Sequence, residues 1–103
     1  MGLLDFILGI KKKRINDFLS RGAIILDVRT SREFNNGAIE GAKHIPLQEL
    51  HNRVNEVKQW NKPVIVYCKA GVRAAKATKY LTLNNIEAIN GGGILKLSRT
   101  LKK

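Results

Sequence analysis

The sequence has a single cysteine in 103 residues, and its aromatic residues are few: one tryptophan, two tyrosines and three phenylalanines. One cysteine excludes an internal disulfide and a cysteine-rich zinc site, and it favours a reducing, cytoplasmic location. The aromatic side chains do not recur among the basic residues as a stacking platform for bases would, which disfavours nucleic acid as a partner. No apolar run approaches the roughly 20 residues that a membrane-spanning helix needs.

Acidic residues are scarce as well. Nineteen Lys and Arg face eight Asp and Glu, which leaves a net charge of +11. Such an excess favours an anionic partner, for example a small anionic substrate or an anionic membrane surface. The composition is otherwise that of an ordinary globular chain, with 44% hydrophobic residues, and the length suffices for one domain with a core of its own.

The first residues differ from the rest, so we separate an apolar and basic segment, 1–12, from a domain spanning 13–103. Leu3, Phe6, Ile7 and Ile10 have the spacing of one helical stripe. A basic run, 11–14, follows the apolar residues, whereas in a signal peptide the positive charge comes first. Two interpretations remain open. The segment is a helix docked on its own domain or on a partner, or residues 1–14 form an anchor on an anionic membrane surface, peripheral to the bilayer.

Short apolar runs alternate with helical patterns along the domain. We expect strands at 23–28, 64–67 and 87–90, a further short strand within 41–46, and a tight loop at Gly91–Gly93. Helices are expected at 3–10, around 15–19, at 31–34, 47–57, 74–83 and 94–101. This alternation predicts an α/β fold, a sandwich with a small, mainly parallel sheet flanked by helices.

Cys68 stands where a buried strand ends and a loop leads into a helix, at the sheet edge where α/β proteins bind ligands. Gly71 permits the positive φ of a tight loop, and the helix that follows directs its positive end at the loop. Lys69 and Arg73 add full charges nearby, and each of these features favours the reactive thiolate. Most free cysteines are merely small buried side chains, but this position argues for a nucleophile.

Four motifs in order give the sequence a family resemblance: Leu26–Arg29 followed by Glu33-Phe34, then Gly41–Pro46, Cys68–Arg73 and Gly91–Gly93. Together they span about residues 13–100, and the chain resembles a single-domain rhodanese. The resemblance implies a three-layer sandwich and a sulfurtransferase of the thiosulfate type. In such an enzyme a catalytic Cys68 takes sulfur from a small anionic donor, or from a persulfide, and passes it to a thiol or cyanide acceptor. The resemblance further implies a substrate-binding loop made of Lys69, Ala70, Gly71, Val72 and Arg73, and no cofactor.

Loop length argues against the main enzymatic rival. Tyrosine and dual-specificity phosphatases place five residues between the cysteine and the arginine, whereas four separate Cys68 from Arg73. Two other classes of function stay open. One is a relay module that carries sulfur between a protein donor and a protein acceptor. The other is a non-catalytic module that binds an anionic surface.

Other polar residues suggest structural roles. Asp27, Arg29 and Glu33 resemble the family's structural ionic cluster, and Arg29 and Glu33 have the i, i+4 spacing of a helical ion pair. His44 and His51 lack the partners of a metal site, so we expect no metal and assign His44 to backbone hydrogen bonding. The sequence departs from the family at Ala38, where histidine is common, and after Gly93, where Ile94 and Leu97 replace an aromatic residue.

Overall fold

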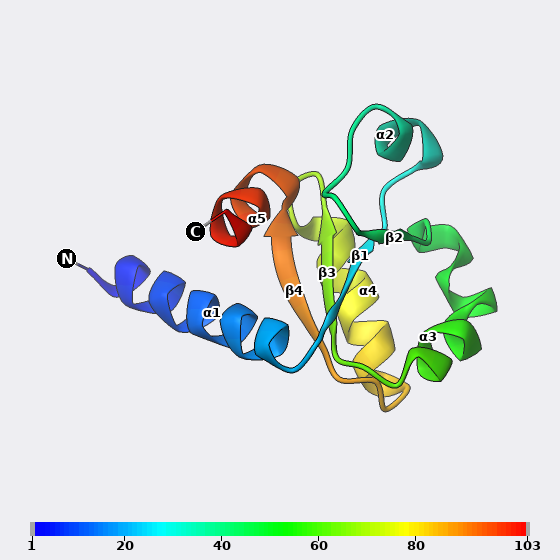
Figure 1. The fold of residues 1–103 in the computed structure, drawn as a ribbon, viewed down its shortest axis with the longest axis horizontal. Coiled ribbons are helices and arrows are strands. Elements are labelled where there is room, and N and C mark those ends of the chain that lie inside the picture. The colour runs from blue at the N-terminus through cyan, green and yellow to red at the C-terminus, as the bar shows by residue number, and fades with distance from the viewer. Residues whose placement is uncertain (1, 103) are drawn as a thin grey trace.

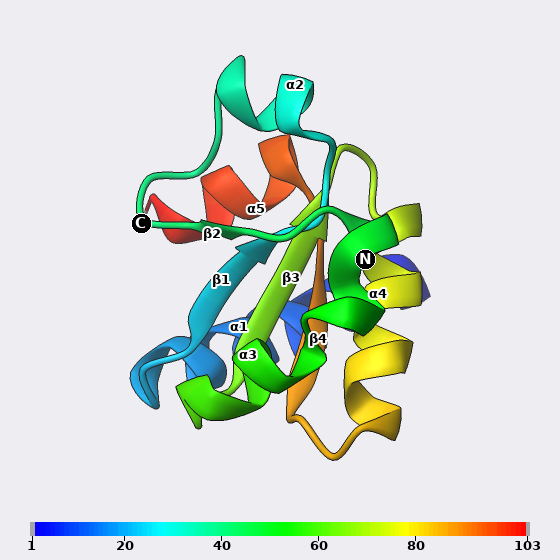
Figure 2. The same ribbon diagram turned by 90° about the vertical axis from the view of Figure 1, so that its right-hand side faces the viewer.

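The computed structural model describes residues 2–102 and forms a four-stranded sheet with helices on both faces (Figures 1 and 2). The elements in chain order are α1 (Leu3–Ser20), β1 (Ile24–Asp27), α2 (Ser31–Asn35), β2 (Lys43–His44), the 3-10 helix η1 (Leu47–Asn52), α3 (Val54–Trp60), β3 (Val64–Cys68), α4 (Val72–Leu83), β4 (Ala88–Gly93) and α5 (Ile94–Leu101).

All neighbouring strands pair in parallel, in the order β2-β1-β3-β4. β3 lies inside the sheet, where all five of its residues are buried. Because the strands are parallel, their carboxyl ends meet at one edge of the sheet, and Cys68 ends β3 at that edge. The predicted mainly parallel α/β sheet is therefore confirmed.

Alternation along β3 divides the core into two layers. Val64, Val66 and Cys68 contribute to a cluster with residues of η1, α3 and α4, whereas Ile65 and Tyr67 pack with residues of α1 and α5. Figure 2 shows these two groups of helices on opposite sides of the sheet. Successive side chains of a strand point to opposite faces, so β3 contributes to both core layers. Helices cover each face, and the expected three-layer arrangement is confirmed.

Three local expectations were wrong. The helices expected at 3–10 and around 15–19 form one continuous helix, α1, because Lys and Arg are good helix formers and neither proline nor glycine interrupts residues 10–21. The expected glycine loop is instead the end of β4, where Gly92 pairs with Tyr67 and Gly93 with Cys68 after a register shift. The helix expected at 47–57 is divided into η1 and α3, with Arg53 between them.

Two leucines of α4 allow a matched test of the core. Leu81 is fully buried and Leu83 is 73% exposed. Leu81→Ala should lower the free energy of unfolding by about 2–5 kcal/mol, since it removes buried methyl groups and leaves a cavity. Leu83→Ala should change it by less than about 0.5 kcal/mol. Urea denaturation followed by circular dichroism measures both, and equal losses for the two variants would contradict the packing described.

Candidate functional site

The thiol of Cys68 lies in a cradle of backbone N–H groups. Its Sγ accepts hydrogen bonds from the backbone N of Gly71, at 3.0 Å, and of Ala74, at 3.3 Å. The residue is 1% exposed, so only a small part of it is accessible from outside. The loop expected from the sequence ended at Arg73, and Ala74 is an additional member that only the coordinates bring to the sulfur.

The loop between β3 and α4 turns at Gly71, whose φ of +101° belongs to the left-handed region that favours glycine. Gly71 is also the N-cap of α4, so the positive end of the helix dipole lies at the sulfur. Lys69, Ala70 and Val72 are exposed. The backbone of the loop, rather than these three side chains, therefore forms the contacts to Cys68.

β4 supports the loop from the neighbouring strand. A Cβ built on Gly93 would lie 2.5 Å from the carbonyl oxygen of Lys69 and 3.2 Å from the Cα of Ala70, so only glycine fits there. The Asn90 side chain donates from Nδ2 to the Gly71 carbonyl oxygen at 3.1 Å, and its Oδ1 accepts from the backbone N of Gly92 at 2.8 Å. Sequence analysis did not single out Asn90, although its place directly before three glycines was a usable signal.

Arg73, expected to contact the anionic end of a donor, is paired with Glu33 in the structure. Its Nη1 and Nη2 donate to the two carboxylate oxygens at 2.7 and 3.0 Å. Arg73 and then the Thr30 backbone amide lower the pKa of Glu33 to about 2. The pair joins α2 to the first turn of α4, and the i, i+4 pair expected between Arg29 and Glu33 does not form.

Arg29 instead pairs with Asp27 at the carboxyl end of β1, with Nη2 2.7 Å from Oδ2, and Nη2 also donates to the Gly37 carbonyl oxygen at 2.7 Å. Both residues are buried. Burial opposes ionisation of Asp27, but the hydrogen bonds from Arg29 outweigh it, and the pKa of Asp27 is lowered. Ionised at neutral pH, this pair holds the strand end in place.

Tyr67 and His44 complete this polar layer. Burial, reinforced by Asp27, raises the pKa of Tyr67 to about 12, so the phenol stays neutral at physiological pH. The Tyr67 hydroxyl accepts from the backbone N of Ile39 at 3.0 Å, next to the position where Ala38 replaces a histidine of the family. His44 Nε2 lies 2.8 Å from the carbonyl oxygen of Arg29, which agrees with the backbone-bonding role predicted for His44.

Two hollows flank the loop at the carboxyl edge. One, of about 550 Å³, is bordered by Gly71 and by three lysines from three helices, Lys11, Lys76 and Lys96. The other, of about 290 Å³, is bordered by Arg73 and residues that follow β1 and β2. Within residues 2–102, no group of three or more His, Cys, Asp and Glu side chains is placed to hold a metal ion.

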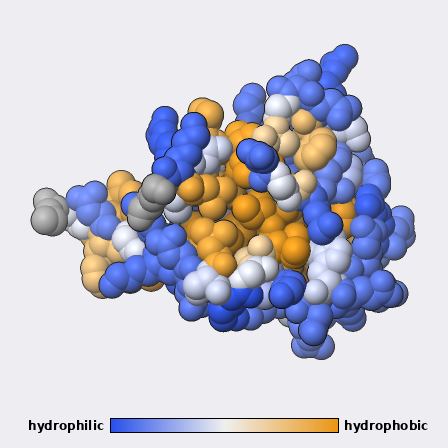
Figure 3. Space-filling view, in the orientation of Figure 1, coloured by the Kyte–Doolittle hydropathy of each residue, from blue (hydrophilic) through white to orange (hydrophobic). Residues whose placement is uncertain are grey.

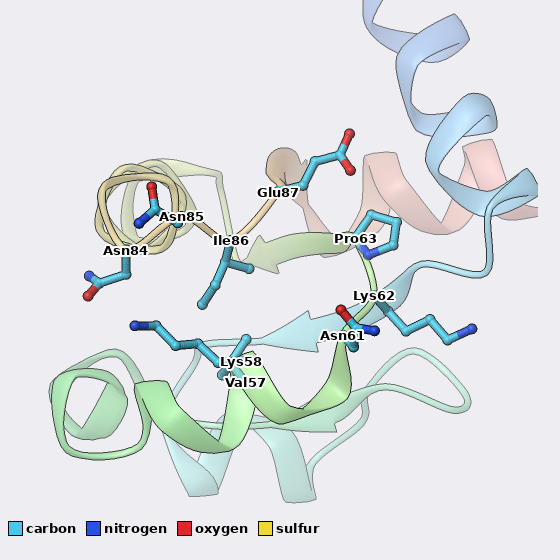
Figure 4. A pocket seen from close by; sticks show the side chains of 9 residues that line it. All are labelled: Val57, Lys58, Asn61, Lys62, Pro63, Asn84, Asn85, Ile86 and Glu87. Carbon is cyan, nitrogen blue, oxygen red and sulfur yellow. The ribbon is translucent and has the colours of Figure 1, made fainter.

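A further pocket, of about 410 Å³, lies between α3 and the turn that precedes β4 (Figure 4). Lys58, Asn61 and Lys62 border it from one side, and Asn84 and Asn85 border it from the other (Figure 4). These residues precede β3 and β4, so the pocket lies at the amino edge of the parallel sheet. Cys68 is about 13 Å away along β3, at roughly 3.3 Å a residue, and no Cys, Ser, Thr or His is among the residues that line the pocket.

Gly93→Ala tests the contact between β4 and the loop. The added methyl group meets backbone atoms, so the loop must shift, and we expect the free energy of unfolding to fall by about 1–3 kcal/mol. The amide of Gly71 should exchange with solvent faster, because its hydrogen bond to Sγ is weakened. Gly9→Ala, with open space around its Cβ, is the control and should be neutral or slightly stabilising. Wild-type exchange at Gly71 in the Gly93 variant would contradict this account.

Glu33→Gln tests the ion pair with Arg73 through pH. The pKa of Glu33 lies near 2 against an ordinary value of 4.5, so its ionised form stabilises the folded state. The stability lost in Glu33→Gln should be full above about pH 4.5 and should shrink as the pH falls toward 2. Urea midpoints at a series of pH values measure it. Glu40→Gln, at an exposed site with no ion pair among the described residues, is the control. A loss independent of pH would refute the pairing.

Comparisons with known proteins agree with this architecture. The model of the rhodanese-like domain family matches residues 11–97. The uncharacterized protein YqhL of Bacillus subtilis (strain 168) is 39% identical over 84 residues, which are 80% of this chain and 66% of that protein. The crystal structure of a rhodanese-like domain protein from Staphylococcus aureus is 34% identical with a TM-score of 0.70, and the match covers 84% of this chain and 86% of that one.

Two further relatives show how lengths and names vary. A thiosulfate sulfurtransferase, GlpE of Ectopseudomonas mendocina (strain ymp), is 27% identical over 86 residues, 81% of this chain and 78% of that protein. A tRNA uridine(34) hydroxylase of Buchnera aphidicola is 28% identical over 98 residues. The chain spans only 31% of that hydroxylase, and about two thirds of the Bacillus protein. The family model covers most of the chain, and the fold agrees with it: the chain belongs to the rhodanese-like domain family.

Proposed function

We propose that the chain is a sulfurtransferase that carries sulfur as a persulfide on Cys68, with thiosulfate or a persulfide as the donor. The observation that carries the proposal is the position of Sγ, which accepts hydrogen bonds from two backbone N–H groups at the positive end of α4. N–H donors and a helix N-terminus stabilise negative charge, so they favour both the attacking thiolate and the anionic terminal sulfur of a persulfide. Relatives named as sulfurtransferases, at 27–28% identity, support the same class of reaction.

The reaction with thiosulfate needs only one nucleophile from the protein, the Cys68 thiolate. The Cys68 thiolate attacks the outer sulfur, the sulfur–sulfur bond of thiosulfate breaks, and sulfite leaves with the electron pair. A persulfide anion remains on Cys68. A thiolate or cyanide then attacks the terminal sulfur, and the Cys68 thiolate is the leaving group. This is covalent catalysis in two displacements, with no net oxidation and no proton donor required for sulfite to leave.

The size and charge of the site favour a small anionic donor. Four residues separate Cys68 from Arg73, one fewer than in the phosphatases, and the cysteine is 1% exposed. The guanidinium of Arg73 is neutralised by Glu33, so it contributes little free charge. The hollow beside Gly71, by contrast, is bordered by three lysines and no carboxylate, and it attracts anions toward the loop.

Intact-mass measurement after incubation with thiosulfate tests the proposal. The protein should gain the mass of one sulfur atom, and a chase with cyanide should remove it while thiocyanate forms. Cys68→Ser should gain nothing while keeping its urea midpoint, and it serves as the matched control. A gain of one sulfur atom in the wild-type protein that is absent from Cys68→Ser would establish the persulfide.

Two other results would redirect the proposal. If thiosulfate adds no sulfur but a protein persulfide does, with Cys68 accessible to alkylation, the chain is a relay module between proteins. The net charge of +11 on the chain would then favour docking of an acidic donor protein. If no donor loads Cys68 although it can be alkylated, the sulfurtransferase proposal fails.

A further inference from the structure

The first half of α1 exposes large apolar side chains. Leu3, Leu4, Phe6, Ile7 and Ile10 are 46–74% exposed, whereas Ile15 and Phe18 in the second half are buried against the sheet. Figure 1 shows the first half projecting beyond the body of the domain, and Figure 3 shows hydrophobic residues gathered on this projection. The domain therefore does not cover these side chains.

The projection is apolar around much of its circumference. Six of the eight residues from 3 to 10 are Leu, Ile or Phe, and the two others are Asp5 and Gly9. At about 100° per residue, Asp5 and Gly9 lie within about 40° of each other, on a narrow polar side. The carboxylate of Asp5 faces the backbone N of Gly2, at 3.4 Å, which caps the helix.

A ring of positive charge follows directly. Lys11, Lys12, Lys13 and Arg14 succeed one another at about 100°, so together they surround the helix. Lys12, Lys13 and Arg14 are exposed. Lys11 is partly buried toward Lys96 of α5, and this burial, with the like charge of Lys96, lowers the pKa of Lys11. We call residues 3–10 the apolar projection and residues 11–14 the basic ring.

We propose that the apolar projection inserts into the surface of an anionic lipid bilayer, with the basic ring at the headgroups. The projection is about 12 Å long at 1.5 Å per residue, less than the roughly 15 Å of hydrocarbon in one leaflet. This length suits an anchor within a single leaflet. In agreement, none of the helices in residues 2–102 has the length and hydropathy of a membrane span.

Charge complementarity favours lipid over a second copy of the chain. Pairing two projections would bring two basic rings together, on molecules that each carry +11. An anionic leaflet supplies apolar chains to the projection and negative headgroups to the ring. Lys96 and Arg99 of the neighbouring α5, and Lys102 directly after it, add to the attraction. The inference does not depend on the sulfur chemistry of Cys68.

Sedimentation of the full chain with vesicles tests this anchor. Binding should be strong on phosphatidylcholine mixed with phosphatidylglycerol and weak on phosphatidylcholine alone, and added salt should weaken it. Phe6→Ser and Ile10→Ser should each lower the partition coefficient about tenfold. Leu83→Ser and Leu95→Ser, at positions 73% and 72% exposed outside the projection, are matched controls that should leave it unchanged.

Two double variants, one in the basic ring and one outside it, test the contribution of the ring's charge. Lys12→Gln with Lys13→Gln should lower binding about fivefold for each charge, whereas Lys58→Gln with Lys79→Gln, exposed elsewhere, should have a smaller effect. Equal losses in test and control variants, or equal binding to neutral vesicles, would overturn the proposal. So would a concentration-dependent dimer abolished by Phe6→Ser, because the projection would then bind a second copy. Loading of Cys68 with sulfur is measured separately on every variant and should not change.

Discussion

The direct backbone contact between β4 and the loop after β3 is the constraint on which the site depends. Gly93 lets the carbonyl of Lys69 approach where any Cβ would collide, and Asn90 holds the carbonyl of Gly71 from the same strand. With the loop held this way, the amides of Gly71 and Ala74 converge on one sulfur atom. The thiol of Cys68 is thus positioned by main-chain packing between parallel strands, and the exposed side chains of the loop do not contact it.

A second layer of polar interactions secures the same edge of the sheet. Asp27 and Arg29 at the end of β1, and Tyr67 near the end of β3, are buried, and they contact each other or nearby backbone groups. The guanidinium of Arg29 also lies over the Tyr67 ring, 5.5 Å from its centroid. The raised pKa of Tyr67 and the lowered pKa of Asp27 keep one neutral and one ionised partner over a wide pH range. The contacts at these strand ends, which position the loop, are therefore insensitive to changes in pH around neutrality.

Strand and helix positions could be predicted because β3 and its neighbours are short apolar runs bounded by turn residues, and because Cys68 stands at a strand-to-helix junction. Partners of charged residues could not, since spacing along the chain reveals only local pairs. Glu33 has Arg29 at i−4, yet it pairs with Arg73, forty residues away in sequence. The glycines of β4 were mistaken for a loop because flexible residues are typical of turns, and only the contact with Lys69 shows why a strand needs them here.

The loop around Cys68 separates two tasks that often share residues. Its amides face the sulfur, while Lys69, Ala70 and Val72 are exposed. Substitutions at these three positions can therefore alter what docks on the site while the thiol keeps its surroundings. Such a loop could acquire new partners during evolution by changing its outer face alone, with the glycines beneath it held constant.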